Sequence, residues 1–415
     1  MMMQTLDRAY FESLDRTDPL AHFREAFELP PAHIYLNGNS LGALPKAARQ
    51  KARDVVEGQW GNGLIRSWNT HDWIHLPRRI GDKIAGLIGA DPGEVIVADS
   101  TSVNLFKLAA AAVKQNPGRS KILSEPGNFP TDLYILQGLE HFLDGQVRLV
   151  TAPRERLLDA IDEDTAVVVL THIHYKTGAM FDMAELTAKA HAKGALVVWD
   201  LSHSTGAVPV HLNQVQADFA VGCGYKYLNG GPGAPGFLYV AKRHQATLQH
   251  PLSGWFGHAH PFAMRDDYEP AAGIERTLCG TTSVVGASLL EVGVDLMASA
   301  SMDLIREKSM RMGQLFIALV EERCSQFGFG LASSKDPEVR GSQVSLTHPQ
   351  GFAIMQALIA RNIIGDFRAP EILRFGFTPL YLRYVDLWDC VDALADIMEN
   401  NLWDQPAYHQ LTAVT

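Results

Sequence analysis

The chain has few cysteines, and they lie far apart. Cys223, Cys279, Cys324 and Cys390 are the four cysteines among 415 residues, and they form no CxxC pair. A zinc knuckle or a disulfide framework needs cysteines that are closely spaced or more numerous. We therefore expect free thiols in a reducing compartment.

Long apolar runs and basic blocks are also lacking. No stretch of about 18 apolar residues occurs, and the first twenty residues carry acidic side chains without the apolar region of a signal peptide. Lys and Arg total 36 against 46 Asp and Glu, which gives a net charge of −10, and no Lys/Arg-rich block could neutralise a phosphate backbone. These absences predict a cytoplasmic protein that binds neither membrane nor nucleic acid.

The composition that remains is that of an ordinary globular enzyme. Hydrophobic residues make up 47% of the chain and charged residues 20%, so a large core can form. The length predicts two domains. We expect an N-terminal segment over 1–65 that packs with the small domain, a large domain over 66–285 and a small C-terminal domain over 286–415.

Short apolar runs alternate with helical patterns through the predicted large domain. They lie at 95–98, 121–123, 147–150, 166–170, 195–199, 219–222 and 237–240. Strands separated by helices form βαβ units, which predicts an α/β fold with a mostly parallel central sheet. Beyond 285, a long helix over 289–321, a strand over 343–347 and helices near 350–361 and 385–401 predict a smaller α+β domain.

Polar residues follow several of these predicted strands. They are 100–102, 128–132, 171–172, 200–203 and 225–226. Ligands of parallel α/β sheets bind beyond the carboxyl ends of the strands. The binding site is expected at that edge.

Asp200 and Lys226 carry the most specific chemical signal. Five apolar residues end at Asp200, and a buried carboxylate there is costly unless a cation lies beside it, such as a protonated pyridine nitrogen. Lys226 follows another apolar strand and precedes a glycine run. A Schiff-base lysine must lose its proton, and burial beside another cationic group favours that loss. The alternatives are a helix-capping Asp200 and a glycine-rich hairpin.

The other requirements of pyridoxal 5′-phosphate (PLP) are met by weaker signals. Ser100, Thr101 and Ser102 precede an apolar helix and could hold a phosphate, although N-capping alone would explain one of these hydroxyls. Phe129 could stack on the cofactor ring. His203 could lie over the same ring or phosphate, although a lone histidine is more often structural. The order of these residues along the chain favours a PLP enzyme.

The sequence closely resembles the kynureninase family, which belongs to the aspartate-aminotransferase-type (fold type I) PLP enzymes. The resemblance runs through nearly the whole chain. It is carried by IYLNGNSLGALP (34–45), EGQWGNGLIRSWN (57–69), NFPTDLYI (128–135), LTHIHYKTG (170–178), WDLSHSTGAVPV (199–210), GCGYKYLNGGPG (222–233), LSGWFGH (252–258) and RFGFTPLY (374–381).

The resemblance implies hydrolysis of L-kynurenine, with 3-hydroxykynurenine as a second possible substrate, to anthranilate and L-alanine in tryptophan catabolism. It implies a homodimer that shares its active sites. The residues implied to bind the cofactor are Thr101, Ser102, Phe129, Pro130, Thr131, Asp132, Thr171, Asp200, His203, Tyr225, Lys226, Trp255 and Thr281, the last reaching the partner's site.

Substrate contacts and catalytic roles follow from the same resemblance. Arg374 is implied to clamp the α-carboxylate, because a guanidinium fork matches a carboxylate. Asn39, Ser40 and Trp68 are expected to contact the substrate. Lys226 is expected to remove the α-proton, while Asp200 keeps the cofactor nitrogen protonated and Tyr225 relays protons. An ordinary surface ion pair is the alternative for Arg374.

One position departs from the family pattern. The family has YLDGNSLG where this chain has YLNGNSLG, so Asn37 replaces an aspartate. No carboxylate is therefore available for a role at that position.

Three other functions stay open. Another enzyme of the same fold, such as a cysteine desulfurase or an aminotransferase, would share Asp200, His203 and Lys226. A binding protein that lost catalysis is disfavoured because Lys226 and Arg374 are both present. A metal hydrolase built on His172, His174, Asp200 and His203 lacks tight ligand spacing, and no metal is expected.

Overall fold

The computed structural model describes residues 6–410, which form two compact units. Within those residues, the first unit consists of 6–47, 176–180 and 300–410, and the second of Ala48–Tyr175 and Phe181–Ser299. The chain thus enters the second unit, returns briefly to the first near 176–180, and returns finally at 300. The boundaries expected at 65 and 285 stay a prediction.

The second unit is built on a seven-stranded sheet of order β4-β10-β9-β8-β7-β5-β6. Its strands are β4 (Val95–Val97), β5 (Lys121–Ser124), β6 (Arg148–Thr151), β7 (Thr165–Thr171), β8 (Leu196–Asp200), β9 (Phe219–Cys223) and β10 (Gly236–Val240). Five neighbouring strands run parallel, whereas β10 is antiparallel to both β9 and β4. The predicted α/β fold with a mostly parallel sheet is confirmed.

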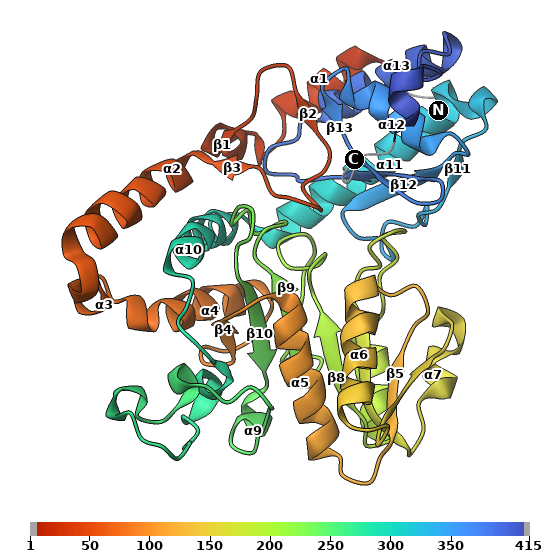
Figure 1. Cartoon of the computed structure of the whole chain (residues 1–415). Coiled ribbons are helices and arrows are strands. Elements are labelled where there is room, and N and C mark those ends of the chain that lie inside the picture. The colour runs from red at the N-terminus through yellow and green to blue at the C-terminus, as the bar shows by residue number, and fades with distance from the viewer. Residues whose placement is uncertain (1–5, 411–415) are drawn as a thin grey trace. The chain divides into compact units, whose positions relative to one another are not determined.

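Helices cover this sheet, and Figure 1 shows α5 and α6 side by side across one face. The helices of this unit are α3 (Ser67–Thr70), α4 (Leu76–Leu87), α5 (Thr101–Gln115), α6 (Pro130–Phe142), α7 (Leu157–Ala160), α8 (Met183–Ala192), α9 (Lys242–Gln245) and α10 (Val284–Ala298). The buried Leu105, Leu108 and Ala112 of α5 pack into one core with strand residues such as Val198 and Val221. Strands covered on both faces need apolar side chains on both faces.

The first unit contains a four-stranded sheet of order β11-β12-β15-β14. These strands are β11 (Gly330–Leu331), β12 (Gln343–Thr347), β14 (Asp366–Arg368) and β15 (Ile372–Gly376), and all their pairings are antiparallel. The unit also contains β1 (Phe27–Glu28), β2 (Ile34–Tyr35), β3 (Leu44–Pro45), β13 (Ile363–Ile364), α1 (Arg8–Arg16), α11 (Met302–Arg323), α12 (Gly351–Ile359) and α13 (Tyr384–Glu399), while α2 (Lys46–Arg53) lies at the boundary of the two units.

The single long helix expected over 289–321 is wrong. The segment forms α10 and α11, with a break between Ala298 and Met302. Ser301 is the N-cap of α11, and its side chain accepts a hydrogen bond from the backbone N–H of Leu304. A serine that satisfies a free N–H group starts a new helix, and the apolar pattern alone hides this restart.

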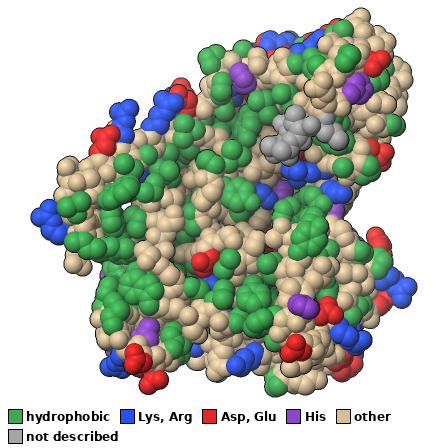
Figure 2. All heavy atoms as spheres, viewed as in Figure 1, with side chains coloured by type: hydrophobic (Ala, Val, Ile, Leu, Met, Phe, Trp, Pro, Cys, Tyr) green, Lys and Arg blue, Asp and Glu red, His purple; other side chains and the backbone are tan. Residues whose placement is uncertain are grey.

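On the face in view, the described surface has no large region of one charge, and the described helices agree with the lack of long apolar runs in the sequence. On the face shown in Figure 2, Lys and Arg side chains lie interspersed with Asp and Glu. Over residues 6–410, no single helix has both the length and the apolarity needed to cross a bilayer, and α10 and α11 meet that test only jointly.

Candidate active site

The parallel register brings the predicted cofactor residues to one edge of the seven-stranded sheet. Thr171 ends β7 and is the direct partner of Asp200, which ends the neighbouring β8. β9 lies on the other side of β8 and ends at Cys223, three residues before Lys226. Three adjacent strands therefore deliver a hydroxyl, a carboxylate and an amine to the same edge.

Lys226 is nearly buried, with 9% of its surface exposed. Its Nζ lies 3.0 Å from Nε2 of His203. The amine also lies 5.7 Å from the ring centre of Phe129 and 5.9 Å from that of Tyr225. The side chain thus sits in a partly aromatic environment that excludes most water.

Two buried carboxylates lie beside this lysine. Thr171 Oγ1 is 3.2 Å from a carboxylate oxygen of Asp132 and 3.5 Å from one of Asp200. Burial, and then repulsion from Asp200, raises the pKa of Asp132 well above its usual range. Two carboxylates in one buried site cannot both stay charged without a cation. The cluster is suited to hold a protonated ring nitrogen.

Asn128 is a site residue to which the sequence analysis gave no role. Its Oδ1 accepts hydrogen bonds from Thr171 Oγ1 at 2.6 Å and from the backbone N–H of Phe129 at 2.7 Å. It therefore links the end of β7 to the start of α6. Its place in the NFPTD motif was the available signal, but an asparagine there resembles an ordinary turn residue.

Phe129 is the N-cap residue of α6, and Pro130 and Thr131 open that helix before the buried Asp132. Proline suits the first helical position because its fixed φ fits and its missing N–H would have no helical partner. The ring of Phe129 is 37% exposed and meets Tyr175 edge to face at 5.3 Å. This exposed ring is available for stacking on a planar ligand.

The start of α5 separates the three hydroxyls of 100–102. Ser100 is the N-cap, and its side chain accepts a hydrogen bond from Val103 N. Among the described residues, Thr101 Oγ1 is buried and has no hydrogen-bond partner. A Cβ on Gly236 would lie 2.9 Å from Thr101 N, so only glycine allows β10 to pass this close. One hydroxyl caps the helix, and Thr101 and Ser102 stay available for an anion at its N-terminus.

Tyr225 is partly buried next to Lys226. Burial raises the pKa of the Tyr225 hydroxyl, so this group is neutral at physiological pH and can donate a hydrogen bond.

The predicted residues Trp255, Thr281 and Trp68 lie elsewhere in the same unit. Trp255 is 38% exposed and packs edge to face on Phe256, which also contacts Trp68. Thr281 is exposed and lines a cavity of about 250 Å³. None of the three contacts Lys226 through an observed hydrogen bond or ring contact among the described residues, so their predicted roles stay predictions.

The predicted substrate residues of the first unit form their own cluster. Arg374 is 2% exposed, and its Nε donates to Asp366 Oδ1 at 2.8 Å while a second nitrogen contacts Oδ2. Ser40 Oγ lies 2.7 Å from Arg374 and 2.8 Å from Asp366. Burial opposes ionisation of Asp366, but Arg374 and then Arg368 lower its pKa. The surface ion pair considered for Arg374 is wrong, because the residue is buried.

Asp366 is the second residue that the sequence analysis missed. It pairs directly with Arg374 in the antiparallel register of β14 and β15. Nothing in the residue pattern between 366 and 374 reveals that register, because the turn between the strands sets it.

Asn39 and Asn37 surround the same region. Asn39 is buried, and its Nδ2 donates to Gln343 at 3.4 Å. Asn37 forms a β-bridge with Gly376. Asn37, which departs from the family pattern, therefore lies beside the end of β15. Its partner Gly376 is two positions after Arg374.

The second unit fits PLP by the chemistry of its donors. A paired buried carboxylate suits a pyridinium, an unpartnered hydroxyl at a helix start suits a phosphate, and an exposed ring suits stacking. Within residues 6–410, no group of three or more His, Cys, Asp or Glu side chains is arranged to hold a metal ion.

Comparison with known proteins gives consistent results. Residues 305–394 match the family model described as "Kynureninase C-terminal domain". The chain is 52% identical over 419 residues to a protein named kynureninase from Burkholderia pseudomallei (strain 1106a), covering 100% of both chains. It is 50% identical to a kynureninase from Pseudomonas fluorescens, covering 97% of this chain and 98% of that one.

Solved structures share the fold at lower identity. An apo cysteine desulfurase from Thermococcus onnurineus NA1 aligns with a TM-score of 0.78 and 18% identity, over 91% of this chain and 98% of that one. A variant of C-DES with glycine linked covalently to its PLP cofactor aligns with a TM-score of 0.75 and 18% identity, over 94% and 100%. These alignments show the fold type I architecture.

Proposed function

Because the chain belongs to the kynureninase family, we propose that it hydrolyses L-kynurenine to anthranilate and L-alanine with PLP as cofactor. This is a carbon–carbon bond hydrolysis in tryptophan catabolism. 3-Hydroxykynurenine is proposed as a second substrate. The observation that carries the proposal is the buried group of Lys226, His203, Thr171, Asp132 and Asp200 at one sheet edge.

PLP, when bound, supplies an electron sink for the bonds that break. Asp200 and Asp132 would hold the proton on the ring nitrogen, which their shared burial favours. Thr101 and Ser102 would bind the phosphate at the start of α5, and Phe129 would lie on the ring. Thr131, Thr171, Trp255 and the backbone of Pro130 are proposed as further cofactor contacts.

Lys226 is the proposed proton-transfer group. Its amine is almost excluded from solvent, and His203 lies within hydrogen-bond distance to orient it. Such a position lets the amine take a proton from the substrate α-carbon and return it elsewhere. Tyr225, neutral because burial raises its pKa, is proposed to donate a proton in the hydrolytic half of the reaction.

Arg374 is the proposed clamp for the substrate α-carboxylate. Asp366 and Ser40 fix the guanidinium, and Arg368 also contacts Asp366, so this cluster carries a net positive charge. A preorganised guanidinium binds a carboxylate with less loss of side-chain entropy. Asn39, Ser40 and Trp68 are proposed to contact the rest of the substrate.

A cysteine desulfurase, which shares the fold, is disfavoured by the thiols. Cys223, Cys324 and Cys390 are buried and Cys279 is partly buried. Burial raises the pKa of all four thiols, that of Cys324 to about 11. A desulfurase needs a reactive thiolate, and raised pKa values disfavour one.

We further propose a homodimer in the cytoplasm, with Thr281 reaching the partner's site. Large apolar side chains between α2 and α4 support an interface: Val56 is 40%, Trp60 60%, Leu64 60% and Ile65 77% exposed. Figure 2 shows hydrophobic side chains gathered at the left, where Figure 1 places this segment. Contiguous exposed apolar surface marks interaction sites.

The direct test is an absorbance spectrum of the purified protein followed by addition of L-kynurenine. We expect a cofactor band near the edge of the visible range and the appearance of fluorescent anthranilate. Lys226→Ala should lose both the lysine-linked band and turnover, because Lys226 supplies the amine of the proposed linkage. Full activity of this variant would overturn the assignment of Lys226, and an aminotransferase would release no anthranilate.

A further inference from the structure

Asp99 has an unusual backbone conformation directly before the proposed phosphate site. It lies between β4 and the N-cap of α5, and its φ is +42°, in the left-handed region that non-glycine residues rarely adopt. Its carbonyl accepts a hydrogen bond from Gly236 N at 2.8 Å. The conformation of Asp99 therefore sets the direction in which α5 leaves the sheet.

Lys107 holds the side chain of Asp99. Lys107 lies six residues after Thr101 on α5 and is fully buried, at 0% exposure. Its Nζ contacts the Asp99 carboxylate closely and also donates to the carbonyl of Thr277 at 2.7 Å. One buried ammonium thus joins the start of α5 to a segment 170 residues further along the chain.

That segment leads to two other proposed cofactor residues. Thr277 ends a short helix, Gly273–Thr277, four residues before Thr281. The carbonyl of Cys279 accepts a hydrogen bond from Phe256 N at 3.2 Å, next to Trp255. A Cβ on Gly254 would collide with the backbone of Cys279, so the backbones of these two segments are in contact there. Lys107 therefore contacts the chain at Thr277, and the Trp255 segment packs against Cys279 two residues further on.

We propose that Lys107 and Asp99 form a positioning pair that fixes the start of α5, the proposed phosphate-binding element, relative to the segment that carries Thr281. The inference rests on the proposed PLP function, and it adds two residues that do not themselves touch the cofactor. The ammonium orients the end of β4 and the start of α5 on one side and the 277–281 segment on the other.

Stability alone does not explain a lysine at this position. A buried ammonium loses its hydration, and its pairing with a carboxylate that is 32% exposed recovers only part of that loss. A methionine would fill similar volume without a charge to satisfy. The lysine adds two directional hydrogen bonds, one to the Asp99 carboxylate and one to the Thr277 carbonyl.

The experiment compares Lys107→Met, Asp99→Asn and the double variant with the wild-type protein. Lys114→Met is the matched control, because Lys114 lies on the same helix and is exposed. Cofactor-free protein is titrated with PLP and, separately, with pyridoxal, which lacks the phosphate, and binding is followed by absorbance. Thermal unfolding of each cofactor-free variant is measured alongside.

We expect the Kd for PLP to rise about tenfold or more in each single variant, and the double variant to resemble the weaker single one, as for residues that act together. The Kd for pyridoxal should change little, so that the ratio of the two constants falls. Lys114→Met should match the wild type in both titrations.

Equal weakening for PLP and pyridoxal would overturn the proposal, because it would indicate general damage to the site. Unchanged PLP affinity in Asp99→Asn would overturn it too, even if Lys107→Met fails to fold. Failure of the wild-type protein to bind PLP would instead contradict the proposed function, and it is observed in the same titration.

Discussion

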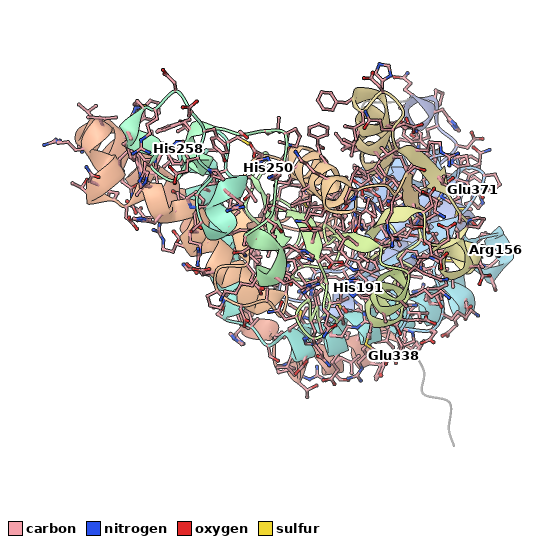
Figure 3. All side chains as sticks on the ribbon, turned by 90° about the horizontal axis from the view of Figure 1, so that it is seen from below. Arg156, His191, His250, His258, Glu338 and Glu371 are labelled. Atoms are coloured by element: carbon pink, nitrogen blue, oxygen red, sulfur yellow. The ribbon has the colours of Figure 1, made fainter. Side chains whose placement is uncertain are left out.

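Two buried aspartates on neighbouring strands of one sheet have opposite surroundings. Asp200 ends β8 at the carboxyl edge, and Asp218 precedes β9 at the amino edge. Asp218 accepts hydrogen bonds from His191 at 2.8 Å, from His244 at 2.8 Å and from Arg243 at 2.7 Å. His191 lies in the last turn of α8 and is labelled in Figure 3, which views the molecule from below.

The electrostatics of the two aspartates differ accordingly. Burial alone would raise the pKa of Asp218, but its hydrogen bonds from His191, His244 and Arg243 lower it far below the usual range. Asp200 instead faces a second buried carboxylate, Asp132, whose pKa is raised. A buried carboxylate that is satisfied by several charged hydrogen-bond donors indicates a structural role, whereas two buried carboxylates that repel each other in one site indicate a ligand site.

Among the buried aspartates, the largest effect should come from Asp200→Asn. We expect this variant to fold and to lose about three orders of magnitude or more in kcat, because an amide cannot hold a proton on the cofactor nitrogen. Steady-state kinetics with L-kynurenine at saturating PLP provide the measurement. A kcat near the wild-type value would show that Asp200 has no role in catalysis.

A third buried aspartate, Asp366, extends the comparison because the protein itself supplies its cation, Arg374. Asp366→Asn should weaken the orientation of Arg374 and raise KM for L-kynurenine about tenfold to a hundredfold, with a smaller change in kcat. Asp396→Asn is the control, because Asp396 pairs with Arg361 on the surface of the same unit. An unchanged KM would mean that Asp366 does not position the clamp.

The smallest effect on activity is expected for Asp218→Asn. This change should lower the free energy of unfolding by roughly 2 kcal/mol, through weakened charge-assisted hydrogen bonds, while kcat stays near the wild-type value. Urea unfolding and steady-state kinetics on the same preparation test both parts. A large loss of kcat without loss of stability would reverse the roles of the two aspartates.

The same variant makes a prediction about pH. The pKa of Asp218 is lower in the folded protein than in the unfolded chain. The contribution of Asp218 to the free energy of unfolding is therefore fully present above the usual carboxyl pKa, near pH 4, and is lost as the pH falls toward the pKa of the folded state. The stability difference between wild type and Asp218→Asn should therefore be full at pH 6 and shrink at pH 3. A difference that grows toward acid would contradict this assignment.

Much of the large sheet could be predicted from the sequence, for a physical reason. Strands covered on both faces are continuous apolar runs, and the seven predicted runs correspond to β4 through β10. Asp200 stands out because a charged residue directly follows such a run, and Lys226 stands out because it comes three residues after the end of another. The break between α10 and α11 was missed because the apolar spacing continues across it, and only the cap at Ser301 marks it.

The contacts between side chains were harder to predict from the sequence. The pairing of Asp366 with Arg374 depends on the register of a hairpin, and the link from Asn128 to Thr171 depends on which strands are neighbours. Lys107 appears in the sequence as one cation in an apolar helix, although its partners lie at Asp99 and Thr277. Such contacts between distant segments leave no local pattern.

The strand order has a consequence for synthesis on the ribosome. β4 and α5 are made early, yet the neighbour of β4 in the sheet is β10, which is translated about 140 residues later. Until Gly236 emerges, nothing pairs with β4 among the strands of this sheet, and the start of α5 lacks the backbone that passes against Thr101. The proposed phosphate site at the start of α5 is therefore completed only late in translation. Capture of the cofactor would report that the nascent unit has closed.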